Sequence, residues 1–399
     1  MSVTAAKGFE ASGVACGIKP SGAPDLALIT TSDRCAVSAA GVFTQNVACA
    51  APVQISRRHL EDGRAAAVVL SSGNANAATG EQGRQDALRM CQLAAEGLGC
   101  DTDDVLVCST GLIGIPMPMA ALEEGVPKAA IAVAGGSEAG DAAARGIMTT
   151  DTVSKQAVAT ASLSDGTTIT VGGMAKGAAM LAPSMATMLA VLTTDASIES
   201  DVLGEALVDA VDGTFNALVV DACTSTNDTV LVLANGAAGN ALIEDSGADL
   251  DAVASAITSV CDQLAGAMAS DAEGATKLVT LTVTGAPSND DARKAARKVA
   301  SSQLVQCSLY GCDPYWGRII SELGTSGVKF DPEQVTISYN GMTPCVNGIA
   351  ASHDEAALAK EMAGRDIEIT CDLHAGEGTA TMRFTDLTHA YIDENTGTS

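Results

Sequence analysis

Apolar positions along the chain follow two periodicities, and each predicts its own kind of element. Short continuous apolar runs between turn residues predict buried strands, notably over 66–70, 105–108, 187–192 and 278–283. Apolar residues at helical spacing predict helices over 82–97, 199–212, 250–268 and 290–304. From about residue 330 the pattern is strand (335–339), helix (355–362), strand (367–371) and strand (379–384). This last segment predicts a small α+β domain.

One stretch, 172–195, combines several unusual features. A glycine-rich loop carrying Lys176 leads through Pro183 to Thr187, the first residue of a predicted buried strand. If the chain were cut between Ala186 and Thr187, the new terminus would carry an amine and a hydroxyl on one residue. The amine, with a pKa of about 8, could take the proton of its own hydroxyl and make it a nucleophile. The alternative is a loop that enters a core strand whose first residue is a threonine by chance.

Polar clusters interrupt the apolar pattern at several other points. Thr110 and Gly111 follow the strand at 105–108, and a glycine there lets backbone N–H groups approach a ligand, as an oxyanion hole requires. The segment 148–152 is strand-like, with hydroxyls that either bind substrate or cap a turn. Small polar residues at 224–228 lie between two predicted strands, and each needs a hydrogen-bond partner. An ordinary turn is the alternative at Thr110–Gly111.

The charge of the chain limits its partners. A net charge of −26 argues against binding to nucleic acid, since no basic patch would outweigh that field. An anionic substrate would need a local positive charge, for which Lys176 is the candidate. No apolar run is long enough to span a membrane, and the first residues lack the apolar core of a signal peptide, so we expect a cytoplasmic protein without a membrane partner.

Cysteine and histidine usage narrows the chemistry. The twelve cysteines are scattered without the spacing of a zinc site, which favours reduced thiols and no bound metal. The chain has 4 histidines, and none lies in a catalytic-looking motif. A mechanism that pairs serine or cysteine with histidine therefore has little support, and a self-contained nucleophile such as Thr187 gains it.

Motifs over essentially the whole chain resemble one family, the glutamate N-acetyltransferase / ornithine acetyltransferase of arginine biosynthesis. They are Ala-Gly-Val-Phe-Thr-Gln-Asn (40–46), Ser-Gly-Asn-Ala-Asn-Ala (72–77), Ser-Thr-Gly-Leu-Ile-Gly (109–114), Met-Thr-Thr-Asp-Thr (148–152), Ala-Lys-Gly-Ala-Ala-Met-Leu-Ala-Pro-Ser-Met-Ala-Thr-Met-Leu (175–189), Ser-Thr-Asn-Asp-Thr (225–229), Glu-Gly-Ala-Thr-Lys-Leu (273–278) and Asp-Pro-Tyr-Trp-Gly-Arg (313–318).

The resemblance implies a fold and a processing event. The fold would be α/β, a layered αββα-type sandwich like that of N-terminal-nucleophile hydrolases, with a smaller C-terminal α+β domain. The precursor would cut itself between Ala186 and Thr187 into chains 1–186 and 187–399. Residues 187–295 would complete the sandwich, and 296–399 would form the C-terminal domain. Two copies of each chain would assemble into a heterotetramer.

The resemblance also implies a reaction and its residues. Thr187 would take acetyl from N-acetylornithine and pass it to glutamate in ping-pong order. The oxyanion hole would consist of Thr110 and Gly111. The substrate-binding positions would be Thr149, Lys176, Thr187, Glu273, Asn395 and Ser399. A neighbour of Thr149 within 148–152 is the alternative substrate contact, and the C-terminal segment would be a docked strand. No bound cofactor is implied, and the sequence leaves open whether acetyl-CoA is a second acetyl donor.

Two other functions compete with this one. A self-processing aminopeptidase or amidase of related architecture would use water as the acceptor in place of glutamate. A non-catalytic binding or sensor protein would keep the fold and stay uncut. Acetyl transfer to glutamate, plain hydrolysis and the mass of the chain distinguish the three.

Overall fold

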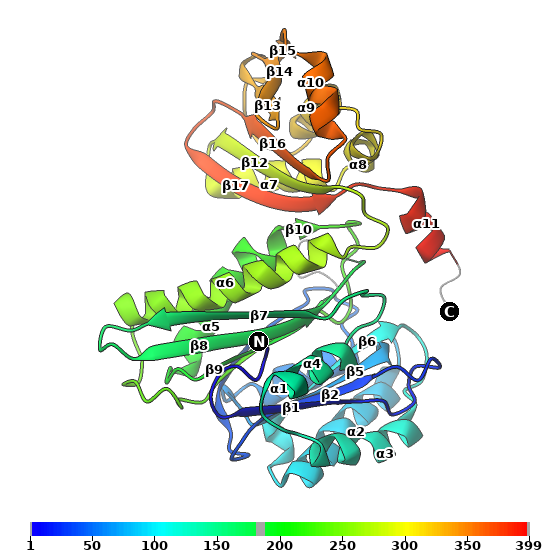
Figure 1. The fold of residues 1–399 in the computed structure, drawn as a ribbon, viewed down its shortest axis with the longest axis vertical. Helices are drawn as coiled ribbons and strands as arrows, with labels where there is room; N and C mark the ends of the chain where they lie inside the picture. The colour runs from blue at the N-terminus through cyan, green and yellow to red at the C-terminus, as the bar shows by residue number, and fades with distance from the viewer. Residues whose placement is uncertain (1, 181–187, 397–399) are drawn as a thin grey trace. The chain divides into compact units, whose positions relative to one another are not determined.

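The computed structural model describes residues 2–180 and 188–396, which divide into two compact units. The larger unit comprises residues 2–177, 188–216 and 224–268, and the smaller one comprises residues 178–180, 217–223 and 269–396. Figure 1 shows the chain coloured from the N-terminus to the C-terminus. Each unit has its own sheets and core, and each is described by itself.

The larger unit is built around two sheets packed face to face. One has the strand order β1-β2-β5-β6: β1 (Phe9–Val14), β2 (Leu26–Thr31), β5 (Ala67–Asn74) and β6 (Val105–Leu112). The other has the order β4-β3-β11-β9-β8-β7: β4 (Arg64–Ala65), β3 (Val37–Phe43), β11 (Thr229–Ala234), β9 (Leu189–Thr194), β8 (Thr168–Lys176) and β7 (Lys155–Ser162). Side chains from both sheets, including Ile29, Leu106, Val191 and Leu231, share one core.

Helices cover the outer faces of both sheets. The four-stranded sheet buries Leu28 and Val69 against α2 (Gly80–Leu98) and α3 (Met119–Ile131). The six-stranded sheet packs against α5 (Ser200–Gly213) and α6 (Ala248–Ser270), and Figure 1 shows α6 beside β7 and β8. The remaining helices of this unit are α1 (Ala51–His59), which packs on β6, and α4 (Ser137–Gly146), which packs on β1. The prediction of an αββα sandwich is therefore confirmed.

The sequence predicted a glycine-rich loop around Gly172, Gly173 and Lys176, but all three lie in β8. A Cβ on Gly172 would overlap the carbonyl oxygen of Ser2, and one on Gly173 would crowd Val260 of α6. Glycine is needed here because neighbouring segments approach the backbone of β8 closely. Gly172 and Gly173 in β8 therefore reflect packing and not a loop.

Helix α6 is the one described helix that is long and apolar enough, by length and composition alone, to cross a membrane, a test that a buried core helix also passes. Half of its most apolar window is buried inside the fold. The buried positions Val253, Ile257, Val260 and Leu264 recur at helical spacing, and Val260 and Leu264 face Gly173 of β8. The apolar side of α6 thus packs on the six-stranded sheet.

The smaller unit contains a seven-stranded mixed sheet of order β10-β17-β12-β16-β13-β14-β15. Its strands are β10 (Leu218–Val219), β12 (Leu278–Ala286), β13 (Thr336–Tyr339), β14 (Met342–Val346), β15 (Ile349–Ala350), β16 (Asp366–Asp372) and β17 (Gly378–Thr385). Its helices are α7 (Asn289–Ala300), α8 (Gln303–Tyr310), α9 (Trp316–Gly324), α10 (Glu355–Met362) and α11 (His389–Asn395). This agrees with the α+β character predicted for the C-terminal region.

The division expected between 295 and 296 is displaced, because it would fall inside α7. Strand β12 is hydrogen-bonded to β16 on one side and to β17 on the other. Ala292, Ala296 and Val299 of α7 lie in the same core as these strands. The longest segment of the smaller unit therefore begins at Ala269, and β12 and α7 belong to it and not to the sandwich.

Two further predictions in this unit were wrong, and side-chain caps explain both. The single helix predicted over 290–304 is broken into α7 and α8, because the Ser302 side chain accepts the N–H of Val305 and starts a new helix. The C-terminal segment, expected as a strand, is α11. Thr388 caps it by accepting the N–H of Tyr391.

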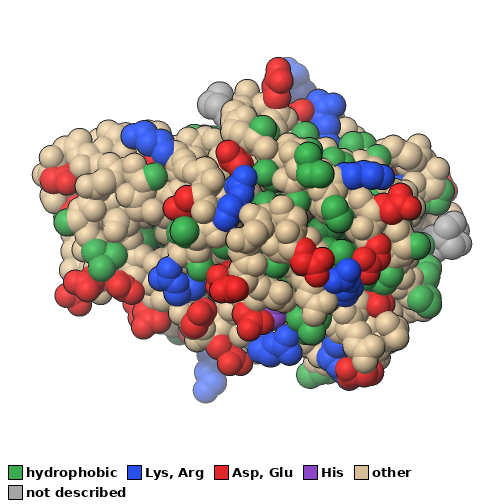
Figure 2. All heavy atoms as spheres, turned by 90° about the horizontal axis from the view of Figure 1, so that it is seen from below, with side chains coloured by type: hydrophobic (Ala, Val, Ile, Leu, Met, Phe, Trp, Pro, Cys, Tyr) green, Lys and Arg blue, Asp and Glu red, His purple; other side chains and the backbone are tan. Residues whose placement is uncertain are grey.

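The acidic composition is visible on the molecular surface. Figure 2 shows Asp and Glu side chains spread over much of one face, with Lys and Arg scattered among them. On that face the basic side chains do not gather into one continuous patch. On that face, positive charge is therefore confined to individual side chains.

Candidate active site

Thr110 and Gly111 lie at the end of β6, where it runs parallel to β5. Thr110 is opposite Ser72 and Gly111 is opposite Gly73. Gly111 has a φ of 134°, and a Cβ there would overlap the backbone of Gly73. No other residue fits this backbone, so Gly111 is required by its conformation and by the close approach of β5. The buried Thr110 precedes it directly.

Lys176 is the last residue of β8 and brings a cation to Thr110. Its side chain is buried, and Nζ donates to Thr110 Oγ1 at 3.4 Å. These two residues come from different sheets, 66 positions apart in the sequence. The structure thus places two of the predicted site residues, Thr110 and Lys176, in hydrogen-bond contact.

Asp151 connects Lys176 to its surroundings. Its carboxylate accepts hydrogen bonds from Lys155 Nζ at 2.6 Å, from the N–H of Gly177 at 2.8 Å and from the N–H of Thr149 at 3.0 Å. Burial opposes ionisation of Asp151, but the charges of Lys176 and Lys155 outweigh it and lower the pKa to about 2. Asp151 therefore stays ionised, and its carboxylate fixes the backbone at both Thr149 and Gly177.

Replacing Asp151 with asparagine is expected to lower the free energy of unfolding by about 3–5 kcal/mol at neutral pH, because it removes one partner of the buried Asp151–Lys155 ion pair. The depressed pKa stabilises the fold at pH values above the ordinary carboxyl pKa of about 4, and this contribution is lost as the pH falls towards 2. Urea unfolding at pH 7 and pH 3 measures both effects. The exposed Asp245 provides the control, and equal losses in Asp151→Asn and Asp245→Asn would contradict the prediction.

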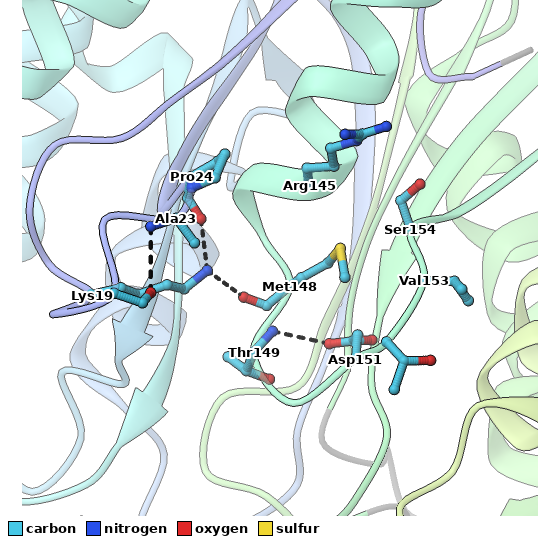
Figure 3. A pocket seen from close by; sticks show the side chains of 11 residues that line it. Lys19, Ala23, Pro24, Arg145, Met148, Thr149, Asp151, Val153 and Ser154 are labelled. Atoms are coloured by element: carbon cyan, nitrogen blue, oxygen red, sulfur yellow. Dashed lines mark hydrogen bonds between the residues drawn. The ribbon is translucent and has the colours of Figure 1, made fainter.

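Thr149 borders a cavity of about 590 Å³ (Figure 3). Lys19 Nζ donates to the carbonyl oxygens of Pro24 at 2.7 Å and of Met148 at 2.6 Å, so it holds the backbone beside Thr149. Thr152 also lines this cavity. The cavity is lined by Lys19, Ser21, Ala23, Pro24, Arg145, Met148, Thr149, Asp151, Thr152, Val153 and Ser154. Segment 148–152, predicted to be strand-like, is irregular because the Asp151 side chain takes the N–H of Thr149.

The polar cluster at 224–228 has structural partners. Asn227 Nδ2 donates to the carbonyl oxygens of Ala75 at 2.6 Å and of Ser109 at 2.8 Å, which ties this segment to the ends of β5 and β6. Asp228 follows, with one carboxyl oxygen accepting the N–H of Met188 at 3.0 Å. The cluster therefore fixes the backbone next to Thr110 and at the start of β9.

In the smaller unit, Glu273 and Asn395 are brought together. Asn395 Nδ2 donates to Glu273 Oε2 at 2.8 Å, and the N–H of Glu273 donates to the carbonyl oxygen of Ala178 at 2.9 Å. Asp221 accepts from the N–H of Met180 at 2.5 Å and from the Tyr391 hydroxyl at 3.1 Å. Glu273 and Asp221 thus both form hydrogen bonds with residues 178–180. Helix α11 contacts the same two acids through Asn395 and Tyr391.

Sequence comparison decides the family. The ArgJ family model matches residues 10–397, nearly the whole chain. The chain belongs to the ArgJ family. It is 48% identical to the arginine biosynthesis bifunctional protein ArgJ of Mycobacterium leprae, in a match covering 100% of this chain and 95% of that protein. It is 46% identical to the ArgJ protein of Streptomyces coelicolor, with 100% of both chains covered.

A solved ArgJ structure is similar to part of the chain. The crystal structure of the arginine biosynthesis bifunctional protein from Bacillus halodurans is 34% identical, with a TM-score of 0.50. The match covers 51% of this chain and 96% of that one. The solved chain is therefore about half as long as this one.

The residues predicted for this ArgJ-family site differ in part from those that the structure describes there. Ala186, Thr187 and Ser399 lie outside the described residues. Sequence reasoning did not single out Asp151 or Asp228, which the structure places beside Lys176 and Met188. Both acids lie inside polar clusters that the sequence had marked, but their partners are distant in the chain. Only the three-dimensional fold could distinguish them from neighbouring hydroxyls.

Proposed function

We propose that this ArgJ-family protein is a self-processing acetyltransferase that moves acetyl from N-acetylornithine to glutamate through Thr187. The observation that carries the proposal is the contact of buried Lys176 with Thr110, beside a Gly111 backbone that only glycine can form. Family membership supplies the chemical context, since the relatives are named as bifunctional proteins of arginine biosynthesis.

In the first half-reaction, the Thr187 hydroxyl attacks the acetyl carbonyl carbon of N-acetylornithine. The hydroxyl proton passes to the Thr187 amine as the Oγ–C bond forms, and that proton then goes to the departing nitrogen as the C–N bond breaks. Ornithine leaves and acetyl-Thr187 remains. Negative charge on the carbonyl oxygen would be stabilised by the Thr110 hydroxyl and the Gly111 N–H.

In the second half-reaction, the amine of glutamate attacks the acetyl ester. The new C–N bond forms, the ester bond to Thr187 breaks, and the proton lost by the amine returns to Thr187 Oγ. Both substrates carry an α-carboxylate, for which Lys176 is the proposed partner because its side chain is a buried cation next to Thr110. In this proposal Thr149 and Ser399 also contact the substrate, while Glu273 and Asn395 receive the side-chain ammonium of ornithine.

The proposal includes a cut between Ala186 and Thr187. The Thr187 amine exists only after that cut, so processing and transfer depend on the same residue. The half-length solved chain from Bacillus halodurans is what a cut relative would contribute. We further propose two copies of each product in the assembly, a cytoplasmic location, and acetyl-CoA as a second acetyl donor without a bound cofactor.

The test is an assay of the purified protein with N-acetylornithine and glutamate. Formation of N-acetylglutamate in step with ornithine, and a mass increase of one acetyl group on the chain that begins at Thr187, would support the proposal. Release of acetate without dependence on glutamate would overturn it in favour of a self-processing amidase. A second reaction with acetyl-CoA and glutamate, without N-acetylornithine, tests the additional donor.

A further inference from the structure

Asp228 is a buried acid that the steps above do not use. It directly precedes β11 and has no exposed surface. One carboxyl oxygen, Oδ1, accepts the N–H of Met188. The other, Oδ2, has no hydrogen-bond partner among residues 2–180 and 188–396. A buried carboxyl oxygen without a partner is costly, so its presence calls for an explanation.

The backbone around Asp228 holds this carboxyl in place. Strands β11 and β9 are parallel, with Thr229 opposite Leu189, so Asp228 and Met188 are neighbours at the start of the two strands. The carbonyl oxygen of Asp228 also accepts the N–H of Thr44 at 2.9 Å. Met188 is the residue after Thr187, and its N–H belongs to the peptide bond that Thr187 forms. The acid is therefore anchored one residue from the proposed nucleophile.

Burial and nearby polar groups act on Asp228 in opposite directions. Burial raises its pKa well above the ordinary carboxyl value, against the opposing effects of the Met188 N–H, the Ser225 hydroxyl and the charge of Lys176. Lys176 is the charged side chain acting on it within the described part of the chain, and its Nζ also donates to Thr110. A cut before Thr187 would create one more cation, the Thr187 ammonium.

We propose that Asp228 is a positioning residue for Thr187, with Oδ1 fixing the amide after the nucleophile and Oδ2 receiving the amine that the cut creates. This inference rests on the proposed function, since it requires the cut before Thr187. The carboxylate and the ammonium would form an ion pair that orients the amine towards the Thr187 hydroxyl. Because an anion stabilises a neighbouring ammonium, the pair would raise the pH at which the amine becomes an effective base.

The experiment compares Asp228→Asn with Asp195→Asn. Asparagine at 228 keeps an acceptor for the Met188 N–H and removes the charge. Asp195 is the matched control: it is buried, follows the other end of β9, and accepts the N–H groups of Thr170 at 2.7 Å and Lys7 at 3.3 Å. For each processed variant, the pH dependence of kcat/KM for N-acetylornithine is measured together with the thermal unfolding midpoint.

We expect Asp228→Asn to move the ascending limb of the kcat/KM profile to lower pH by about one unit. We also expect kcat to fall about tenfold, because the Thr187 amine would no longer be held in one orientation. Asp195→Asn should lower the unfolding midpoint and leave the profile in place. An unchanged ascending limb in Asp228→Asn would overturn the proposal. That result is expected if Asp228 has only a structural role, or if Oδ2 binds a water molecule and not the Thr187 amine.

Two further outcomes are informative. If Asp228→Asn stays uncut, Asp228→Glu takes its place, because it keeps the charge but moves it by one methylene. A displaced limb in that variant supports the proposal, and an unchanged limb overturns it. If the unsubstituted protein forms no N-acetylglutamate at any pH, the proposed function itself fails, which the parent assay reveals before any variant is compared.

Discussion

Replacing Thr187 with alanine is expected to leave the 399-residue chain uncut and to reduce acetyl transfer by at least about 1,000-fold. Alanine lacks the hydroxyl that would attack the Ala186 carbonyl during processing and the acetyl carbonyl during transfer. Loss of the hydroxyl therefore removes both steps at once. Intact-mass measurement reports the cut, and N-acetylglutamate formation reports the transfer.

Thr187→Ser and Thr193→Ala are the matched controls. Serine keeps a hydroxyl, so that variant should still be cut and keep part of its activity. Thr193 is a buried threonine on β9 whose hydroxyl donates to the carbonyl oxygen of Val3 at 2.6 Å, so its replacement should affect stability and not processing. A Thr187→Ala protein that is cut and active would disprove the assignment of the nucleophile.

Replacing Gly111 with alanine is expected to reduce kcat by about 100-fold to 1,000-fold, as the loss of one oxyanion-hole donor does. The added Cβ would overlap the backbone of Gly73, and a φ of 134° is unfavourable for alanine. The end of β6 must shift, and the Gly111 N–H moves with it. Steady-state kinetics with N-acetylornithine, together with thermal unfolding, measures the effect.

Gly114 is the control for this prediction because it lies three residues after Gly111, just beyond the end of β6. It too has a positive φ, 80°, but nothing lies within 4 Å of a Cβ added there. Gly114→Ala therefore carries the conformational cost without the overlap. If Gly114→Ala and Gly111→Ala lose kcat equally, the close approach of Gly73 does not define the site.

Periodicity predicted regular elements well wherever local packing decides them. The helix expected over 82–97 is α2 (Gly80–Leu98), and that expected over 355–362 is α10 with the same bounds. Patterning failed where one side chain redirected the backbone, as at Ser302 and Thr388, whose hydroxyls begin new helices. It also failed at Gly172 and Gly173, because the neighbours that require glycine there are far away in the sequence.

The sequence motifs predicted which residues belong to the site, but not which of them contact one another. Thr110, Gly111 and Lys176 were candidates from the sequence, and the structure places Thr110 and Lys176 in contact. The role of Asp151 depends on Lys155, Lys176 and Gly177 converging on one buried carboxylate, which no local pattern reveals. Glu273 and Asn395 form a pair 122 residues apart, so their contact also required the fold.

The strand order of the six-stranded sheet has a consequence for the proposed cut. Residues before Thr187 supply β4, β3, β8 and β7, and residues after it supply β11 and β9, which lie between β3 and β8. Once cut, the two products would share a continuous hydrogen-bonded ladder, and neither would hold a complete sheet alone. Refolding after denaturation would then need two chains to meet, so recovery would depend on protein concentration. Processing would turn a reversible, single-chain folding reaction into a bimolecular one, and persistence of the mature enzyme would rest on how slowly it unfolds.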